Sequence, residues 1–314
     1  MVPKFPNIPR LSVVVPYTGD SEAFETSLVS VLQHRPCSCE ILVPHDGSYD
    51  DPFDLGDEVR FLDAGSRRLM PLIAAAAAAA HGRFVHVLSD GHAATAGWSD
   101  VALEMFEHHD AGIVVPVVRD QPSGPVAYAG WRAGKSAACE LIGGGQSEVP
   151  AKAAAVVDGA FLSAGFFRRQ LLRSLVGLYR GDDLLEASVV AGLAARTAGW
   201  RTIVAKSSNV IRDGGQANGA TPDYALEIAS NHRRLQAFVD QARGSGGWGQ
   251  SLSRFIATAA GGYGVASALQ RATAPLAETA VRQILSTAEV CRPEELGDTL
   301  TVSMGRPQPS RRAA

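Results

Sequence analysis

Carboxylate and hydroxyl side chains follow directly after two short apolar segments near the start of the chain. The side chains are Thr18, Asp20, Asp46 and Ser48, and the segments before them are 11–16 and 40–44. Such groups exchange hydrogen bonds with the hydroxyl and ring N–H groups of a polar ligand. Asp46-Gly-Ser48 also fits a simple tight turn, because Asp and Gly dominate turns for local reasons.

Two further groups of ionisable side chains have spacings that suit chemistry. Asp90 and His92 follow the apolar segment 83–88, and a carboxylate with an imidazole is a donor pair that divalent transition metals accept. Asp183 and Glu186 are three residues apart, so they share a helix face, and either suits a general base. The alternative interpretations are a polar loop and an acidic helix start that the helix dipole favours.

A strand–helix–strand unit positions the first set of side chains. The β-branched run 11–16 ends at Pro16, as expected for a strand that is covered on both faces. Asp20 or Ser21 caps the helix that follows, and 40–44 is the second strand, which makes a right-handed parallel crossover. Ligands of open α/β sheets bind beyond the carboxyl ends of the strands, so we expect a polar site there.

The next segments alternate between strand and helix patterns. The predicted strands are 59–63, 83–88, 111–118 and 200–205, and the predicted helices are 69–81, 98–109, 168–178 and 182–198. We expect Gly82 to end its helix, 119–150 to mix loop and β structure, and 153–167 to be a strand that enters a turn. This alternation predicts an α/β protein with a mostly parallel, doubly wound central sheet and flanking helices.

Composition favours a soluble globular protein. The 314 residues are 46% hydrophobic and 19% charged with a net charge of −3, whereas nucleic acid or an anionic membrane calls for a basic surface. The longest apolar run, 69–80, is well short of the roughly 20 residues of a transmembrane helix. The first ten residues have no apolar core of a signal peptide, and the cysteines form no disulfide framework, so we expect a cytoplasmic protein.

A glycine-rich segment, 213–219, predicts the boundary of the α/β domain. The domain then spans 1–213, a helical C-terminal extension spans 214–300, and a disordered tail spans 301–314. Helical patterns within the extension cover 222–243, 250–271 and 275–290. These helices are candidates for a homodimer interface.

Four segments in order resemble an inverting glycosyltransferase of family 2. They are LSVVVPYTGD (11–20), EILVPHDGSYDD (40–51), AHGRFVHVLSD (80–90) with Gly97-Trp98, and 159–167 with a later AGWR (198–201). The resemblance covers roughly residues 10 to 208 and implies the GT-A fold, with the C-terminal helices as an appendage. It also implies transfer of a sugar from a nucleotide-sugar donor to a hydroxyl acceptor with inversion.

The resemblance implies which residues bind the nucleotide sugar. They are Pro16, Thr18, Asp20, Asp46, Ser48 and Asp90. The family's helix with a polar Arg/Asn pair is apolar here at 71–76, so Arg68, with Arg67 beside it, is the candidate contact for the diphosphate.

The metal motif of the family is degenerate in this chain. The two expected carboxylate positions hold Ser89 and Gly91, and Asp90 lies between them with His92 just after. The resemblance implies Mg²⁺ or Mn²⁺, which prefer oxygen ligands. Asp90 and His92 are therefore the candidate metal ligands.

The catalytic-base motif is degenerate as well. An ungapped count places the base at Ala187 and Ser188, so Glu186 or Asp183 has to replace it. The first prediction is an enzyme of the hexosyltransferase type. The lost carboxylates leave a second one open, a GT-A-like pseudoenzyme that binds a nucleotide, a glycan or a protein partner without transferring sugar.

Overall fold

The structure is a computed structural model of the chain. It describes residues 8–108, 110–133, 139–179, 181–212 and 290–296, together with Tyr224, Ile228 and Leu235. These last three are helical, but the remainder of the predicted C-terminal helices and the tail lies outside the described residues. The domain boundary near residue 213 therefore stays a prediction.

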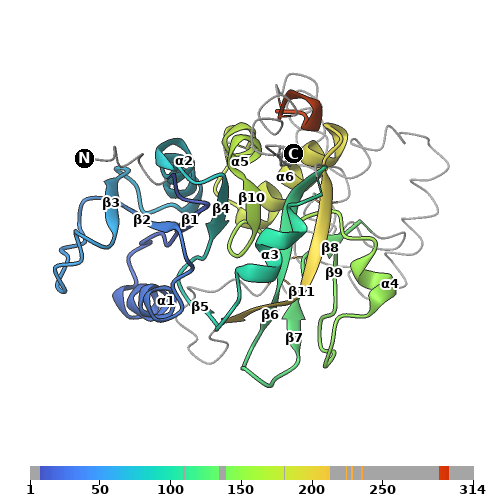
Figure 1. Cartoon of the computed structure of the whole chain (residues 1–314), viewed down its shortest axis with the longest axis horizontal. Helices are drawn as coiled ribbons and strands as arrows, with labels where there is room; N and C mark the ends of the chain where they lie inside the picture. The colour runs from blue at the N-terminus through green and yellow to red at the C-terminus, as the bar shows by residue number, and fades with distance from the viewer. Residues whose placement is uncertain are drawn as a thin grey trace, which may run out of the picture.

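A nine-stranded mixed sheet forms the centre of the molecule (Figure 1). Its order is β3-β2-β1-β4-β10-β6-β11-β5, and β7 pairs with β6 outside this path. The strands are β1 (Leu11–Val14), β2 (Cys39–His45), β3 (Arg60–Asp63), β4 (Phe84–Val87), β5 (His92–Ala94), β6 (Ala111–Arg119), β7 (Val126–Tyr128), β10 (Phe166–Arg168) and β11 (Arg201–Arg212). Strands β1 to β4 are mutually parallel neighbours, whereas β10, β5 and β7 run antiparallel to their partners. A small second sheet joins β8 (Trp131–Arg132) to β9 (Glu140–Leu141).

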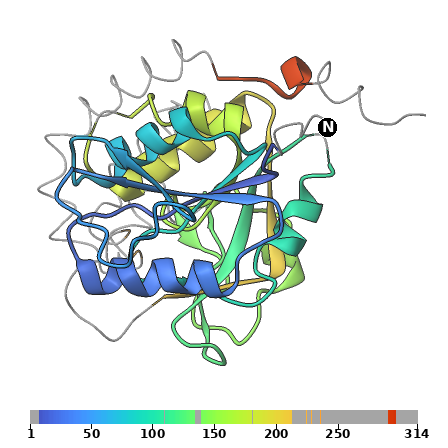
Figure 2. The same cartoon turned by 60° about the vertical axis from the view of Figure 1, so that its left-hand side comes forward.

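Helices cover both faces of the large sheet. They are α1 (Ser21–Gln33), α2 (Leu69–Ala79), α3 (Asp100–Met105), α4 (Ala151–Ala154), α5 (Arg169–Leu175) and α6 (Leu184–Thr197), with a 3₁₀ turn at Pro293–Leu296. Figure 2 shows α1 on one face and α2, α5 and α6 together on the other. The predicted α/β class with a mostly parallel sheet and flanking helices is confirmed.

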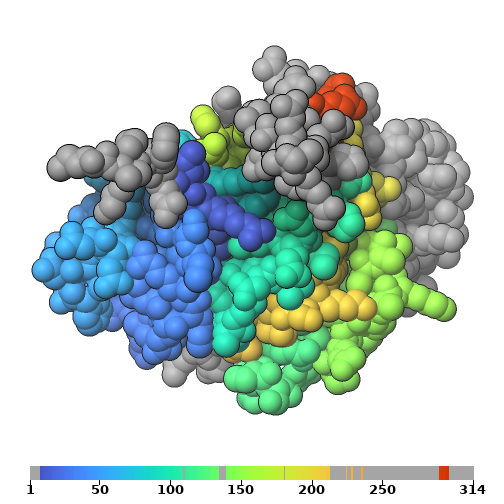
Figure 3. Space-filling model, viewed as in Figure 1, coloured from blue at the N-terminus to red at the C-terminus, as the bar shows by residue number. Residues whose placement is uncertain are grey.

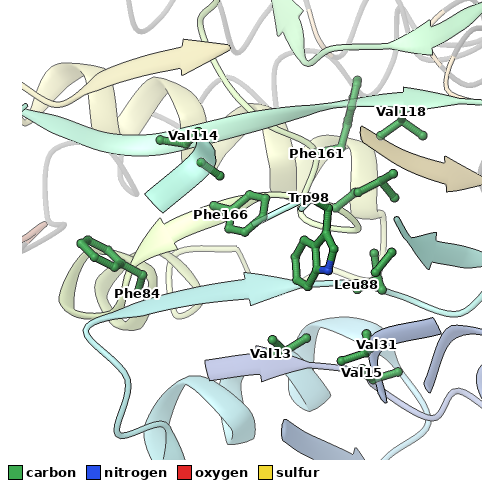
Figure 4. Packing of buried hydrophobic residues seen from close by; sticks show 14 of the residues in the cluster. Val13, Val15, Val31, Phe84, Leu88, Trp98, Val114, Val118, Phe161 and Phe166 are labelled. Carbon is green, nitrogen blue, oxygen red and sulfur yellow. The ribbon is translucent and has the colours of Figure 1, made fainter. Parts of the chain in front are cut away.

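Strands that are buried on both faces create two hydrophobic cores, one on each side of the sheet. On the α1 side, Trp98 is fully buried among side chains of β1, β4 and β10 (Figure 4). Its ring lies 5.4 Å from that of Phe166 and 4.6 Å from that of His86. Burial of each large apolar side chain contributes about 1.5–3 kcal/mol, so this packing fixes the strands whose ends carry the polar loops.

Two local predictions were wrong. The strand expected over 153–167 does not form, because residues 153 and 154 end helix α4 and regular strand begins only at β10. Between them, Gly159 makes an isolated bridge with Trp131, and a Cβ there would lie 2.7 Å from the indole nitrogen. Gly82 does not cap α2, which ends at Ala79. Glycine is required at position 82 because a Cβ would lie 2.5 Å from the backbone nitrogen of Ser12.

Candidate functional site

The loops that follow β1, β2, β3 and β4 meet at one edge of the sheet. These strands are parallel neighbours, so their carboxyl ends point the same way. Every predicted nucleotide-binding residue comes from these loops. On the face seen in Figure 3, the N-terminal unit in blue lies beside the teal segment that follows β4.

Thr18 and Asp90 tie the first of these loops to the fourth. The Thr18 hydroxyl donates a short hydrogen bond to Oδ2 of Asp90, and the Thr18 backbone nitrogen lies 3.4 Å from the same oxygen. Asp90 is only 2% exposed. Burial raises the pKa of its carboxyl group, and the hydrogen bond from Thr18 opposes this rise. The carboxylate therefore holds the first loop in place.

Asp46, Ser48 and Arg67 form a second hydrogen-bonded group, which lies at the surface. Oδ1 of Asp46 accepts from the backbone nitrogen of Ser48 at 3.0 Å and from its hydroxyl at 2.5 Å. Nε of Arg67 donates to Oδ2 of Asp46 at 2.5 Å, and Nη2 donates to the Ser48 hydroxyl at 3.0 Å. Hydrogen bonds from Ser48 and Arg67 hold the pKa of Asp46 well below its usual range, so the carboxylate is ionised.

Three aromatic rings pack together beneath the first and second loops, which follow β1 and β2. Tyr17, Phe24 and Tyr49 pack with ring centroids between 4.8 and 5.3 Å apart. Tyr17 directly precedes Thr18, and Tyr49 directly follows Ser48. The rings therefore fix the spacing between the first and second loops.

Two predicted binding residues have structural contacts of their own. Pro16 is buried where the chain leaves β1. Asp20 is the N-cap of α1, and its Oδ1 accepts from the backbone nitrogen of Ala23 at 3.1 Å, as the sequence predicts for a capping aspartate. A direct contact between either residue and a nucleotide stays a prediction.

His92 lies behind the fourth loop and is fully buried. Its Nε2 lies 2.9 Å from the Tyr128 hydroxyl, and its Nδ1 lies 3.2 Å from both the carbonyl and hydroxyl oxygens of Ser89. Burial lowers the pKa of the imidazole to about 4, so the ring is neutral at pH 7. Both ring nitrogens already have partners, and none of these three contacts involves the Asp90 carboxylate, which bonds to Thr18 instead.

The residues of the fourth loop do not fit a divalent cation. Asp90 is one buried carboxylate that binds Thr18, and His92 has both nitrogens engaged. Among the residues that the structure describes, no three His, Cys, Asp or Glu side chains form a group suited to a metal ion. A hard cation favours several oxygen ligands, carboxylates among them, and this loop offers a single carboxylate.

The start of α6 carries the two candidate bases. Oδ1 of Asp183 caps the helix by accepting from the backbone nitrogen of Glu186 at 2.9 Å. Glu186 is fully buried, and its Oε2 accepts from the Tyr179 hydroxyl at 2.6 Å. Arg68 forms an exposed ion pair with Asp182, so the loop after β3 reaches the start of α6.

Sequence reasoning missed several partners of the predicted residues. The bond of Arg67 to Asp46 has a weak signal in the sequence, since Arg67 adjoins Arg68, the candidate contact for the diphosphate. Tyr128 beside His92 and Tyr179 beside Glu186 had none, because only the folded chain brings them together.

Comparison with known proteins places the chain by its fold alone. No family model matches the sequence, and no curated protein sequence matches it. The structure of GalNAc-T7 with UDP, GalNAc and Mn²⁺ is similar, with a TM-score of 0.51 and 14% identity. The match covers 91% of this chain and 59% of that one, so this chain spans little more than half of its length. The chain has a GT-A glycosyltransferase fold.

A second similar structure is the mannosyltransferase PcManGT from Pyrobaculum calidifontis in complex with GDP-Man and Mn²⁺. It has a TM-score of 0.47 and 16% identity, and the match covers 92% of this chain and 88% of that one. As for a membrane span, no helix in the described part of the GT-A-like chain is both long and apolar enough to form one.

Proposed function

We propose that the chain is a glycosyltransferase that moves a sugar from a nucleotide-sugar donor to a hydroxyl acceptor with inversion. The observation that carries the proposal is the hydrogen-bonded polar set at the carboxyl edge of β1 to β4, on a GT-A fold. This edge is where α/β sheets bind ligands. The similar GalNAc-T7 structure holds UDP, which supports a nucleotide as the ligand.

In this proposal the surface group of the second loop binds the nucleoside part of the donor. Asp46 and Ser48 offer acceptor oxygens for ribose hydroxyls or a ring N–H, next to Thr18 from the first loop. Asp90 acts through Thr18 as a positioning residue. Arg68, which follows Arg67 in the sequence, is exposed and supplies positive charge for the diphosphate.

The reaction requires one new bond and one broken bond at the anomeric carbon. The acceptor oxygen attacks from the face opposite the diphosphate, and the bond from the anomeric carbon to the diphosphate oxygen breaks with its electron pair on that oxygen. A carboxylate takes the proton of the acceptor hydroxyl. Glu186 and Asp183, in or just before the first turn of α6, are the proposed carboxylates.

Calorimetry and a turnover assay test the proposal. UDP- and GDP-sugars are titrated into the protein with and without Mn²⁺, and release of UDP or GDP is followed with and without hydroxyl acceptors. We expect binding of at least one donor and acceptor-dependent release. Absence of binding by every donor, with and without Mn²⁺, would contradict the proposal.

A GT-A-like pseudoenzyme is the second candidate, and the burial of Glu186 favours it. A base has to reach the acceptor hydroxyl, but this carboxylate has no exposed surface and accepts from Tyr179. Asp183 uses one carboxylate oxygen to cap α6. This protein would bind a nucleotide, a glycan or a partner protein without releasing UDP or GDP from a donor.

The two candidates differ in how turnover responds to mutation. If the chain is a transferase, Glu186→Gln or Asp183→Asn abolishes acceptor-dependent release while donor binding stays within about twofold. Donor binding without release in the unmodified protein, across a broad acceptor panel, favours the pseudoenzyme. The α3 variant Glu104→Gln serves as the matched control, because it removes an exposed carboxylate on a different helix.

A further inference from the structure

We propose that the guanidinium of Arg67, rather than a divalent cation, provides the positive charge for the donor's diphosphate. The inference rests on the proposed function and deepens it, because it names a metal-independent mode of binding a nucleoside diphosphate. It starts from a disagreement between the fold and the residues of the fourth loop.

The disagreement lies in the ligands that the fourth loop presents. Asp90 directs a carboxylate oxygen to Thr18 and is 2% exposed, so little of it faces an incoming diphosphate. His92 lies deeper, between Ser89 and Tyr128. A diphosphate in this site still carries negative charge that some group has to balance.

Arg67 is the cation that lies between the first two loops. Its Nε and Nη2 donate to Asp46 and Ser48 in the second loop. A Cβ at Gly19 in the first loop would lie 3.5 Å from Cδ and from Nη1 of the arginine. The guanidinium therefore lies where both nucleotide-side loops approach each other.

The chemistry of the arginine suits a diphosphate. The group is planar, stays charged, and has five N–H donors, of which these two contacts use one from Nε and one from Nη2. More than half of the side chain is exposed, at 57%. Parallel N–H donors match pairs of phosphate oxygens. The exposed edge of the guanidinium can therefore donate to a phosphate while Nε still donates to Asp46.

Arg68 lies next to Arg67 and extends the same positive charge toward α6. Its ion pair with Asp182 is exposed on both sides, with 61% and 65% of the two side chains accessible. Exposed ion pairs contribute little in water, so a diphosphate can replace Asp182 as its partner. In this arrangement two arginines that are consecutive in the sequence would both contribute positive charge to the donor's diphosphate, which is a dianion.

The test uses UDP, GDP, UMP and GMP as probes of the full chain. Each is titrated by calorimetry in EDTA and again in Mn²⁺, into the unmodified protein and into Arg67→Ala, Arg67→Lys and Arg35→Ala. Arg35 is the matched control, because it forms an exposed ion pair with Glu58 and lies before β2, at the opposite edge of the sheet. Circular dichroism checks that each variant is folded.

We expect a diphosphate to bind in EDTA with an affinity within about twofold of that in Mn²⁺. Arg67→Ala lowers diphosphate affinity by about 10-fold or more and monophosphate affinity by much less, since a charged hydrogen bond is lost. Lysine restores part of the loss because it lacks the planar fork. Arg35→Ala leaves every affinity unchanged.

Three results overturn the inference alone, and a fourth overturns it together with the proposed function. Binding that requires Mn²⁺, or diphosphate affinity that survives in folded Arg67→Ala, refutes the role of Arg67 and leaves the glycosyltransferase proposal intact. Equal losses for diphosphate and monophosphate place Arg67 at the nucleoside and refute its role as the diphosphate's cation. If the unmodified protein binds none of the four nucleotides in either buffer, both proposals fail together.

Discussion

The Asp46–Ser48–Arg67 group at the carboxyl edge of the sheet and Glu186 at the start of α6 both rely on a hydrogen-bonded carboxylate, but they differ in burial. Asp46, Ser48 and Arg67 bind one another at the surface. Glu186 has no exposed surface and accepts from Tyr179. A surface group exchanges its partners for a ligand at little cost, whereas a buried one loses stability when its partner is removed. Under the proposed function, the first group is therefore the better candidate for direct ligand contact, and Glu186 also contributes to the stability of the fold.

Removal of the Glu186 carboxylate is expected to have the largest effect. Glu186→Ala leaves the Tyr179 hydroxyl without this acceptor and opens space in the core, which lowers the free energy of unfolding by about 2–4 kcal/mol. Glu186→Gln keeps an oxygen for Tyr179 and costs about 1 kcal/mol. Denaturant unfolding measures both values.

The matched control for Glu186 is Glu104→Ala, at an exposed position on α3. Its cost is expected to stay within about 0.5 kcal/mol. If Glu186→Ala proves as mild as the control, the carboxylate is not part of the fold. The contrast between the two regions would then collapse.

Acid should weaken the fold through the buried histidine behind the fourth loop. Burial lowers the pKa of His92 to about 4, below its value in the unfolded chain. Its stabilising contribution is complete above pH 6.5 and is lost as the pH falls toward 4, which amounts to about 3 kcal/mol. Asp90 acts in the opposite direction, because its raised pKa lets the folded state take up a proton first.

A variant of His92 tests the contribution of this histidine to the pH dependence of stability. In His92→Gln, the loss of unfolding free energy between pH 6.5 and 4 should shrink relative to the unmodified protein. His34→Gln, at an exposed position after α1, should leave the pH profile unchanged. An unchanged profile in His92→Gln would show that the imidazole is not held neutral.

Much of the fold could be predicted from the sequence because its signals are local. The apolar run of β1, the cap at Asp20 and the alanine-rich α2 each occupy a continuous stretch. The antiparallel insertion of β10 between β4 and β6 could not be predicted, because it depends on pairing between distant segments. The sequence predicts Gly82 as the end of a helix, but glycine is required there because a Cβ would collide with the backbone of Ser12 in the neighbouring strand β1.

The candidate site was predictable in its residues but not in its contacts. The placement of Thr18, Asp46 and Asp90 in neighbouring loops follows from the order of parallel strands. The sequence offered Asp90 and His92 as one donor pair, but the fold turns the carboxylate to Thr18 and the imidazole to Tyr128. Side-chain direction after a strand depends on the loop conformation, which no spacing rule gives.

Removal of the Thr18 hydroxyl is expected to have an intermediate effect. Thr18→Val keeps the shape of the side chain but deprives the buried Asp90 carboxylate of a donor, which costs about 1–2 kcal/mol. Thr197→Val is the control, because within the described part of the chain its hydroxyl bonds to the Leu193 carbonyl of α6 and to no other element. Equal losses in the two variants, measured by denaturant unfolding, would show that the bond between the first and fourth loops adds nothing.

The smallest effect on stability and the clearest one on binding are expected for Asp46→Asn. The carboxylate is 17% exposed and bonds within a group near the surface, so its replacement should lower the free energy of unfolding by less than Thr18→Val does. It should weaken nucleotide binding about 10-fold, because the amide is a poorer acceptor and no longer holds Arg67 by charge. Glu58→Gln, which breaks the exposed pair with Arg35, should alter neither quantity. If Asp46→Asn unfolds readily but binds nucleotide normally, the comparison is reversed, because the Asp46–Ser48–Arg67 group would then stabilise the fold rather than bind a ligand.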